Sequence, residues 1–71
     1  MGQHQLIVDW MREHGSISPM EAFEHLGVTK LSTRIGELIR LGVKIIKTRV
    51  EGVNRFGQPV HYMTYRLAEA A

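Results

Sequence analysis

The apolar residues between positions 3 and 14 recur at the spacing of one helix face. Gly15 follows them, and glycine commonly ends a helix because it adopts the left-handed backbone conformation without steric cost. The pattern therefore predicts a first helix over residues 3–14. The expected stripe, at i, i+1, i+4 and i+5, consists of Leu6, Ile7, Trp10 and Met11.

A capping box and a proline mark the start of a second helix. Ser18 and Glu21 stand three residues apart, the spacing at which each side chain can bond the other's backbone N–H. Pro19 takes the first helical position, where its missing N–H costs nothing. We expect this helix to start at Pro19 and to stop at Gly27, with Ile17 pointing inward just before it. Its expected buried residues are Ala22, Phe23 and Leu26.

A third apolar stripe predicts a helix over about residues 29–41. Leu31, Ile35 and Leu38 recur at i, i+4 and i+7, and Leu41 is expected to complete the stripe before Gly42. Thr29 is a good N-cap residue because its hydroxyl can accept from a free backbone N–H of the first turn.

After Gly42 the apolar period changes from 3.6 to 2, which predicts two strands. Val43–Glu51 is rich in β-branched residues, residues 52–59 hold turn-forming residues, and Val60–Leu67 is the return strand. The expected fold class is α+β, with a three-helix bundle followed by a two-stranded β-hairpin. We expect one domain over residues 1–67 and a tail over 68–71.

The charge of the chain is divided between its two halves. Residues 1–28 hold one basic and four acidic residues, for a net −3, whereas residues 29–66 hold eight basic and two acidic residues, for a net +6. Such a division within one small domain predicts a cationic face suited to a polyanion.

The sequence gives no sign of an enzyme, a metal centre or a cofactor site. It has no cysteine, no glycine-rich phosphate loop and four scattered histidines without metal-ligand spacing, so no cofactor is expected. No apolar run approaches the roughly 18 residues needed to cross a bilayer, and no signal peptide is apparent. We therefore expect a cytoplasmic protein without a membrane partner.

The second and third predicted helices, joined by a short turn, match a helix-turn-helix, in which the second of the two helices enters the major groove of DNA. Such a helix needs hydrogen-bond donors and positive charge on its free face. The polar residues of the third helix that meet this need are Thr29, Lys30, Thr33, Arg34, Glu37 and Arg40.

Several segments also resemble a known family. These segments are similar to the small winged helix-turn-helix domains of phages and prophages, and they comprise residues 15–22, 26–28, 31–38, 41–45 and the ending 62–67. The resemblance covers roughly residues 4–67. It implies a winged-helix fold and DNA binding, and Arg34 is the residue most characteristic of the family's third helix. Gly36 departs from the family pattern, which more usually has a polar residue there.

The resulting hypothesis is a phage-type transcriptional regulator that binds double-stranded DNA. Thr33, Arg34 and Glu37 are expected near base edges, with Arg34 projecting opposite Ile35 and Leu38. Arg55 and Asn54, in the loop of the wing, are expected at the backbone or the adjacent minor groove. The residues expected over phosphates are Lys30, Arg40, Lys44 and Lys47. One such module buries only about 600–1,000 Å² on DNA, so tight specificity is expected to require a homodimer or tandem binding sites.

An alternative hypothesis is a protein-interaction module. Winged helices also serve as adaptor surfaces, and a phage-encoded one could inhibit a host protein such as a defence nuclease. The apolar loop residues Val53 and Phe56 favour this reading, because exposed apolar side chains often mark contact surfaces.

Overall fold

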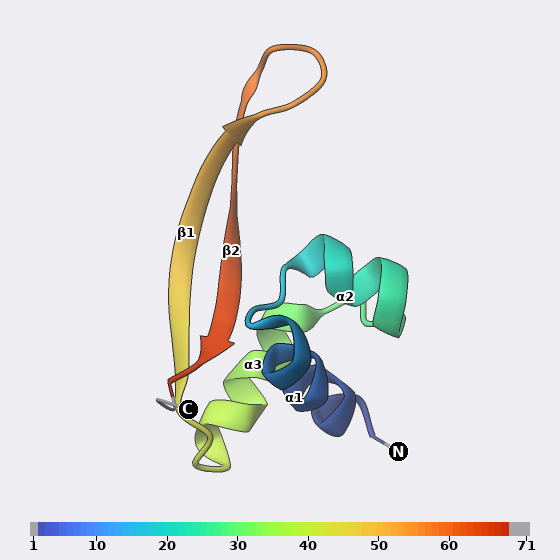
Figure 1. The fold of residues 1–71 in the computed structure, drawn as a ribbon, viewed down its shortest axis with the longest axis vertical. Helices are drawn as coiled ribbons and strands as arrows, with labels where there is room; N and C mark the ends of the chain where they lie inside the picture. Colours follow the sequence, from blue (N-terminus) through green and yellow to red (C-terminus); the bar gives the residue numbers. More distant parts are fainter. Residues whose placement is uncertain (1, 69–71) are drawn as a thin grey trace.

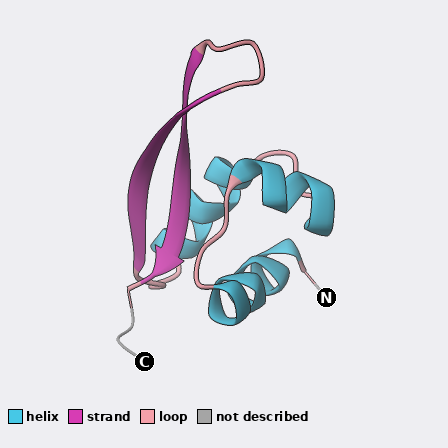
Figure 2. Ribbon diagram, turned by 45° about the horizontal axis from the view of Figure 1, so that its top comes forward, coloured by secondary structure: helices cyan, strands magenta, loops and turns pink. Residues whose placement is uncertain are grey.

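The computed structural model describes residues 2–68, which form three helices followed by an antiparallel hairpin (Figure 1). Helix α1 spans Gln3–His14, α2 spans Pro19–Leu26 and α3 spans Leu31–Arg40. Strand β1 spans Ile45–Val53 and β2 spans Pro59–Leu67. The expected α+β architecture, three helices and a hairpin, is confirmed. Figure 2 shows the helices grouped beside the lower part of the hairpin, whose upper part stands clear of them.

The hairpin is anchored to the helices through the link between α1 and α2. The strands pair from Ile45 opposite Leu67 to Val53 opposite Pro59. The N–H of Ile17 donates to the carbonyl of Tyr65 at 2.8 Å, and the N–H of Tyr65 donates back to the carbonyl of Ile17 at 2.9 Å. This isolated bridge adds a third, one-residue strand on the free side of β2.

The loop of the hairpin is shorter than the sequence predicted. Gly52, Val53 and Pro59 belong to the paired strands, so the loop runs over residues 54–58. It closes because the N–H of Asn54 donates to the carbonyl of Gln58 at 2.9 Å. At the other end of the hairpin, the N–H of Ala68 donates to the carbonyl of Lys44 at 2.9 Å. Residues 69–71 of the expected tail lie outside the described residues.

The core draws on every helix, on both inter-helix connections and on β2. Tyr65 is the strand residue within it, and the bridged Ile17 is fully buried. Burial of such side chains is the main stabilising contribution in a domain this small. The buried residues are Ile7, Met11, Ile17, Ala22, Val28, Leu31, Ile35, Leu38 and Tyr65.

The capping box that was predicted from the sequence is present at the start of α2. The N–H of Glu21 donates to the Ser18 hydroxyl oxygen at 3.2 Å, and the N–H of Ser18 donates to the Glu21 carboxylate at 2.9 Å. Gly27 ends the helix in the left-handed conformation, with φ of 69°. Both ends of α2 were therefore predicted correctly from local sequence signals.

Two residues that were expected in the core are exposed. Phe23 is 59% exposed, because Ala22 lies on the buried side of α2 and its neighbour turns about 100° away. Leu41 is 73% exposed, because α3 ends at Arg40 and the left-handed Gly42 redirects the chain. Val43, after that turn, packs against the core in its place.

The expected N-cap of α3 at Thr29 is wrong. The helix begins at Leu31, and Lys30 is the N-cap residue, without a side-chain capping hydrogen bond. The N–H of Val28 donates to the carbonyl of Ala22 at 3.0 Å, and the Val28 side chain is buried. Because Val28 is tied to α2 in this way, the chain needs two more residues before it can enter α3, and Thr29 lies exposed in the turn.

Candidate nucleic-acid interface

The free face of α3 is fixed by the residues that α3 buries. Leu31, Ile35 and Leu38 point into the core, so the opposite side of the helix is directed away from the body. Thr33 and Arg40 stand seven residues apart, close to two helical turns, and both are exposed on that side. We call the outward surface around these two residues the free face of α3. It presents a hydroxyl and a guanidinium, both of which can bind DNA.

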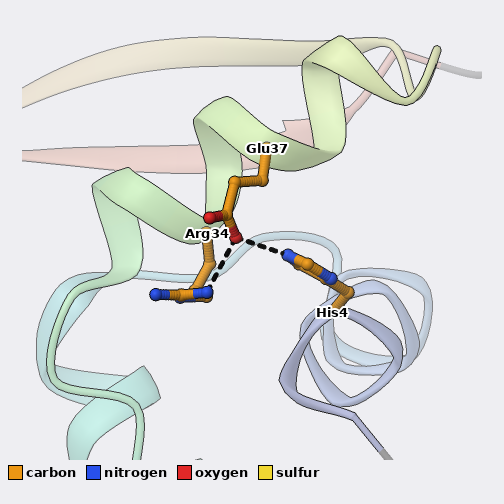
Figure 3. A network of polar contacts seen from close by, with 3 residues as sticks. All are labelled: His4, Arg34 and Glu37. Atoms are coloured by element: carbon orange, nitrogen blue, oxygen red, sulfur yellow. Dashed lines mark hydrogen bonds and ion pairs between the residues drawn. The ribbon is translucent and has the colours of Figure 1, made fainter.

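Arg34 and Glu37 lie on the flank of α3 that faces α1, where they meet His4 (Figure 3). Oε1 of Glu37 is 2.8 Å from Nη1 of Arg34 and also 2.8 Å from Nε2 of His4. The Arg34 and Glu37 side chains are only 32% and 35% exposed. One carboxylate oxygen therefore ties the guanidinium of α3 to the imidazole of α1.

This network favours the ionised form of Glu37. The hydrogen bond with His4 is the main cause that lowers the pKa of Glu37 below its ordinary 4.5. Partial loss of solvent opposes the shift, and the charges of Arg34, His4 and Arg40 add to it. Glu37 is thus a carboxylate at neutral pH, and it neutralises part of the positive charge of α3.

The expected orientation of Arg34 is wrong. It does not project opposite Ile35 and Leu38, but lies beside the buried stripe, because each residue advances only about 100° around the helix. Its Nη1 is held by Glu37, and within residues 2–68 no other side chain bonds its remaining guanidinium donors. Those donors are the part of Arg34 that can reach a ligand.

Exposed lysines lie at both ends of α3 and continue into the hairpin. Lys30 precedes the helix, Lys44 precedes β1, and Lys47 lies within β1. Arg49 is exposed two residues further along, with its Nε 3.5 Å from the Glu51 carboxylate. Since side chains alternate along a strand, Lys47 and Arg49 share one face of the hairpin. It is the face that also holds the buried Tyr65, which is paired with Lys47, so it is turned toward the helices.

The wing tip, residues 54–58, is organised by Asn54. Its Oδ1 accepts from the N–H of Phe56 at 2.9 Å and from the N–H of Gln58 at 3.0 Å. The amide oxygen of Asn54 therefore shapes the loop. Arg55 is exposed, with its Cζ 6.0 Å from the centre of the Phe56 ring, within cation–π range.

The tip and the start of α3 lie toward the same end of the molecule. In Figure 1 the hairpin continues along the long axis beyond the N-terminal end of α3. The wing tip is therefore nearer to the first turn of α3 than to its last turn.

Neither a metal centre nor a membrane span is found in the part of the chain that the structure describes. Within residues 2–68, no three His, Asp or Glu side chains gather closely enough to hold a metal ion. None of the helices in that range combines the length and the apolar character needed to cross a bilayer.

Comparison with known proteins agrees with this geometry. The family model for the winged helix-turn-helix domain matches residues 2–70. The chain belongs to the winged helix-turn-helix family. In these terms α2 and α3 are the helix-turn-helix and the β1–β2 hairpin is the wing. A winged helix-turn-helix domain suggests DNA binding and is typically not an enzyme fold. No curated protein and no solved structure matches the chain.

Two residues of this surface were not singled out from the sequence. Arg49 could have been, because it alternates with Lys47 in the same predicted strand. His4 could not, because it lies 33 residues from Glu37 and reaches it only through the packing of α1 against α3.

Proposed function

We propose that this winged helix-turn-helix protein is a transcriptional regulator of phage or prophage type that binds double-stranded DNA in the cytoplasm. Helix α3 enters the major groove, and the wing contacts the backbone or the adjacent minor groove. The observation that carries the proposal is the free face of α3. Thr33 and Arg40 are exposed on this face, while the opposite side of the helix is packed into the core. The position of the wing tip beyond the start of α3 supports simultaneous contact with both grooves.

The contacts divide into base readers and phosphate binders. Thr33 lies on the free face, close to base edges. Arg34 and Glu37 read bases from the α1 flank, Arg34 through the donors that Glu37 leaves free. Arginine recognises guanine and a carboxylate accepts from cytosine, so the pair suits a G·C base pair. The residues assigned to the phosphates are Thr29, Lys30, Arg40, Lys44 and Lys47, and those assigned to the wing contact are Asn54 and Arg55.

The test is fluorescence anisotropy on a duplex selected from a randomised library, beside a scrambled duplex, over a series of salt concentrations. Each phosphate contact adds about 0.9 to the slope of log affinity against log salt. Arg34→Ala is expected to weaken binding to the selected duplex by about 1–3 kcal/mol and to flatten sequence preference. Arg55→Ala is expected to weaken both duplexes equally and to lower the slope by about one unit.

A matched control is Arg66→Ala, which removes an arginine from the opposite face of the hairpin from Lys47. It should leave both the affinity and the salt slope close to those of the wild type. If the wild type shows no salt-dependent binding to any duplex, the DNA-binding proposal is wrong.

A second candidate function is supported by the wing tip. Phe56, within the tip, is 78% exposed, and Val53, at the adjoining end of β1, is 68% exposed. Apolar side chains displayed at the tip also suit a protein contact, such as that of a phage-encoded inhibitor with a host protein or defence nuclease. This candidate predicts a protein complex that depends on Phe56 and is weakly sensitive to salt.

We also propose that DNA is bound by two copies of the chain. A single module of this size covers too little DNA for tight and specific binding. Sedimentation of the protein with its selected duplex tests this, since two copies per duplex are expected. A stoichiometry of one would rule out the homodimer on that site.

A further inference from the structure

Helix α3 contains a glycine that the protein itself does not require. Gly36 lies within the helix, and glycine destabilises a helix interior relative to alanine because it loses more backbone freedom on folding. Its backbone is not in the left-handed region, unlike Gly15, Gly27, Gly42 and Gly57. A Cβ added at Gly36 would meet no atom within 4 Å. Neither backbone conformation nor packing explains the residue.

The position of Gly36 on the helix suggests an explanation outside the protein. Its surface neighbours, three and four residues away on either side, are Ser32, Thr33, Ile39 and Arg40. All four are exposed, and Ile39 is 40% exposed. The missing side chain leaves a gap of one methyl group, which we call the Gly36 notch. Two hydroxyls border it on one side, and an apolar side chain and a cation border it on the other.

We propose that the Gly36 notch is a specificity-determining contact that receives the C5-methyl group of a thymine in the major groove. The inference rests on the proposed DNA-binding function and adds a base preference to it. Thymine displays a methyl group in the major groove, whereas adenine, guanine and cytosine carry no methyl group there. Ile39 gives that methyl group an apolar wall, and Ser32 and Thr33 can hydrogen-bond the polar edges of the same or the next base pair.

The test replaces thymines by uracils, one at a time, in the duplex selected for binding. This change removes the methyl group and keeps the hydrogen-bonding groups. The wild type is expected to bind about fourfold more weakly at one position, the value of one buried methyl group. Gly36→Ala is expected to lose that discrimination, because the alanine methyl fills the notch. It should bind the thymine duplex at least about fourfold more weakly and the uracil duplex about as well as the wild type does.

Thermal melting separates this effect from damage to the fold. Gly36→Ala should raise the melting temperature by about 4–8 °C, because alanine favours a helix interior. Gly52→Ala is the matched control, since Gly52 also has ordinary backbone and open space but lies in β1. It should keep the preference for thymine over uracil.

The possible outcomes distinguish failure of the thymine-contact proposal from failure of the DNA-binding proposal. If the wild type binds DNA but treats thymine and uracil alike at every position, the notch proposal is overturned and the DNA-binding function stands. The same holds if Gly36→Ala keeps the wild-type discrimination. If the wild type binds no duplex at all, both proposals fail.

Discussion

The helical body (residues 3–40) and the wing (residues 45–67) are stabilised in different ways. Eight of the nine buried residues described in residues 2–68 belong to the body, and the ninth is Tyr65 of the wing. Ile45, Met63 and Leu67 of the wing also pack against this core, but they are only partly buried. The wing instead rests on one ladder of backbone hydrogen bonds and on the bridge between Ile17 and Tyr65. Isolated two-stranded hairpins are marginally stable in water, so the wing depends on this bridge, on Tyr65 and on the partly buried residues at the base of the hairpin.

In this small domain, different residues provide folding stability and contact with a ligand. Side chains that hold the body together are not available to a ligand, whereas most side chains of the wing are free because backbone bonds hold the strands. Helix α3 does both, because Ile35 is buried in the core on one side and Arg40 is exposed to a ligand on the other. Substitutions of buried body residues should therefore change folding, and substitutions of exposed residues of α3 and of the wing should change binding.

The largest expected effect is that of Ile35→Ala. The side chain is fully buried at the centre of the body, so its truncation should lower the free energy of unfolding by about 2–4 kcal/mol through cavity formation. Urea and thermal melting measure this. Ile39→Ala, on the exposed side of the same helix, is the matched control and should cost much less. Equal losses for the two variants would mean that the helix register is wrong.

A smaller effect is expected from the cap of α2. Ser18→Ala removes the hydroxyl that accepts from the N–H of Glu21 and should cost about 1 kcal/mol. Ser32→Ala, an exposed serine on α3, controls for the loss of a hydroxyl. An unchanged melting curve for Ser18→Ala would show that the capping box contributes nothing to the stability of the body.

The His4–Glu37–Arg34 network predicts a pH-dependent contribution. The folded protein lowers the pKa of Glu37 below its ordinary 4.5, so the network stabilises the fold above that pH. The stabilisation is lost as the pH falls through the lowered pKa of the folded state. The difference in urea midpoint between the wild type and Glu37→Gln should therefore shrink as the pH falls below 4.5. Glu13→Gln, which changes an exposed carboxylate of α1, controls for net charge. A Glu37→Gln difference that grows as the pH falls below 4.5 would refute the assignment.

The smallest effect on stability is expected at the wing tip. Phe56→Ser should change the free energy of unfolding by no more than about 0.5 kcal/mol, because the ring is exposed. Chemical denaturation checks this against the wild type. A loss of stability comparable to that of Ile35→Ala would show that the tip packs against another part of the protein. The wing tip would then contribute to folding as the body does.

Local signals in the sequence determined most of the body. The stripe of Leu31, Ile35 and Leu38 was readable because helical spacing alone places these residues on one face, and the capping box of α2 was readable because its two partners are three residues apart. The change of period after Gly42 likewise identified the hairpin, because side-chain alternation belongs to a strand wherever it lies. These interactions join residues that are close together in the chain, so they can be predicted from the sequence alone.

Only the tertiary structure decided how these elements meet. Phe23 and Leu41 are as apolar as their buried neighbours, and their exposure follows from the packing of α2 and the turn after α3. The hydrogen bond between His4 and Glu37, the carboxylate that also holds Arg34, joins positions 33 residues apart. The open space above Gly36 likewise depends on where every other element lies. Spacing in a sequence fixes which residues share a face of one helix, but what that face meets is set by the packing of all the elements together.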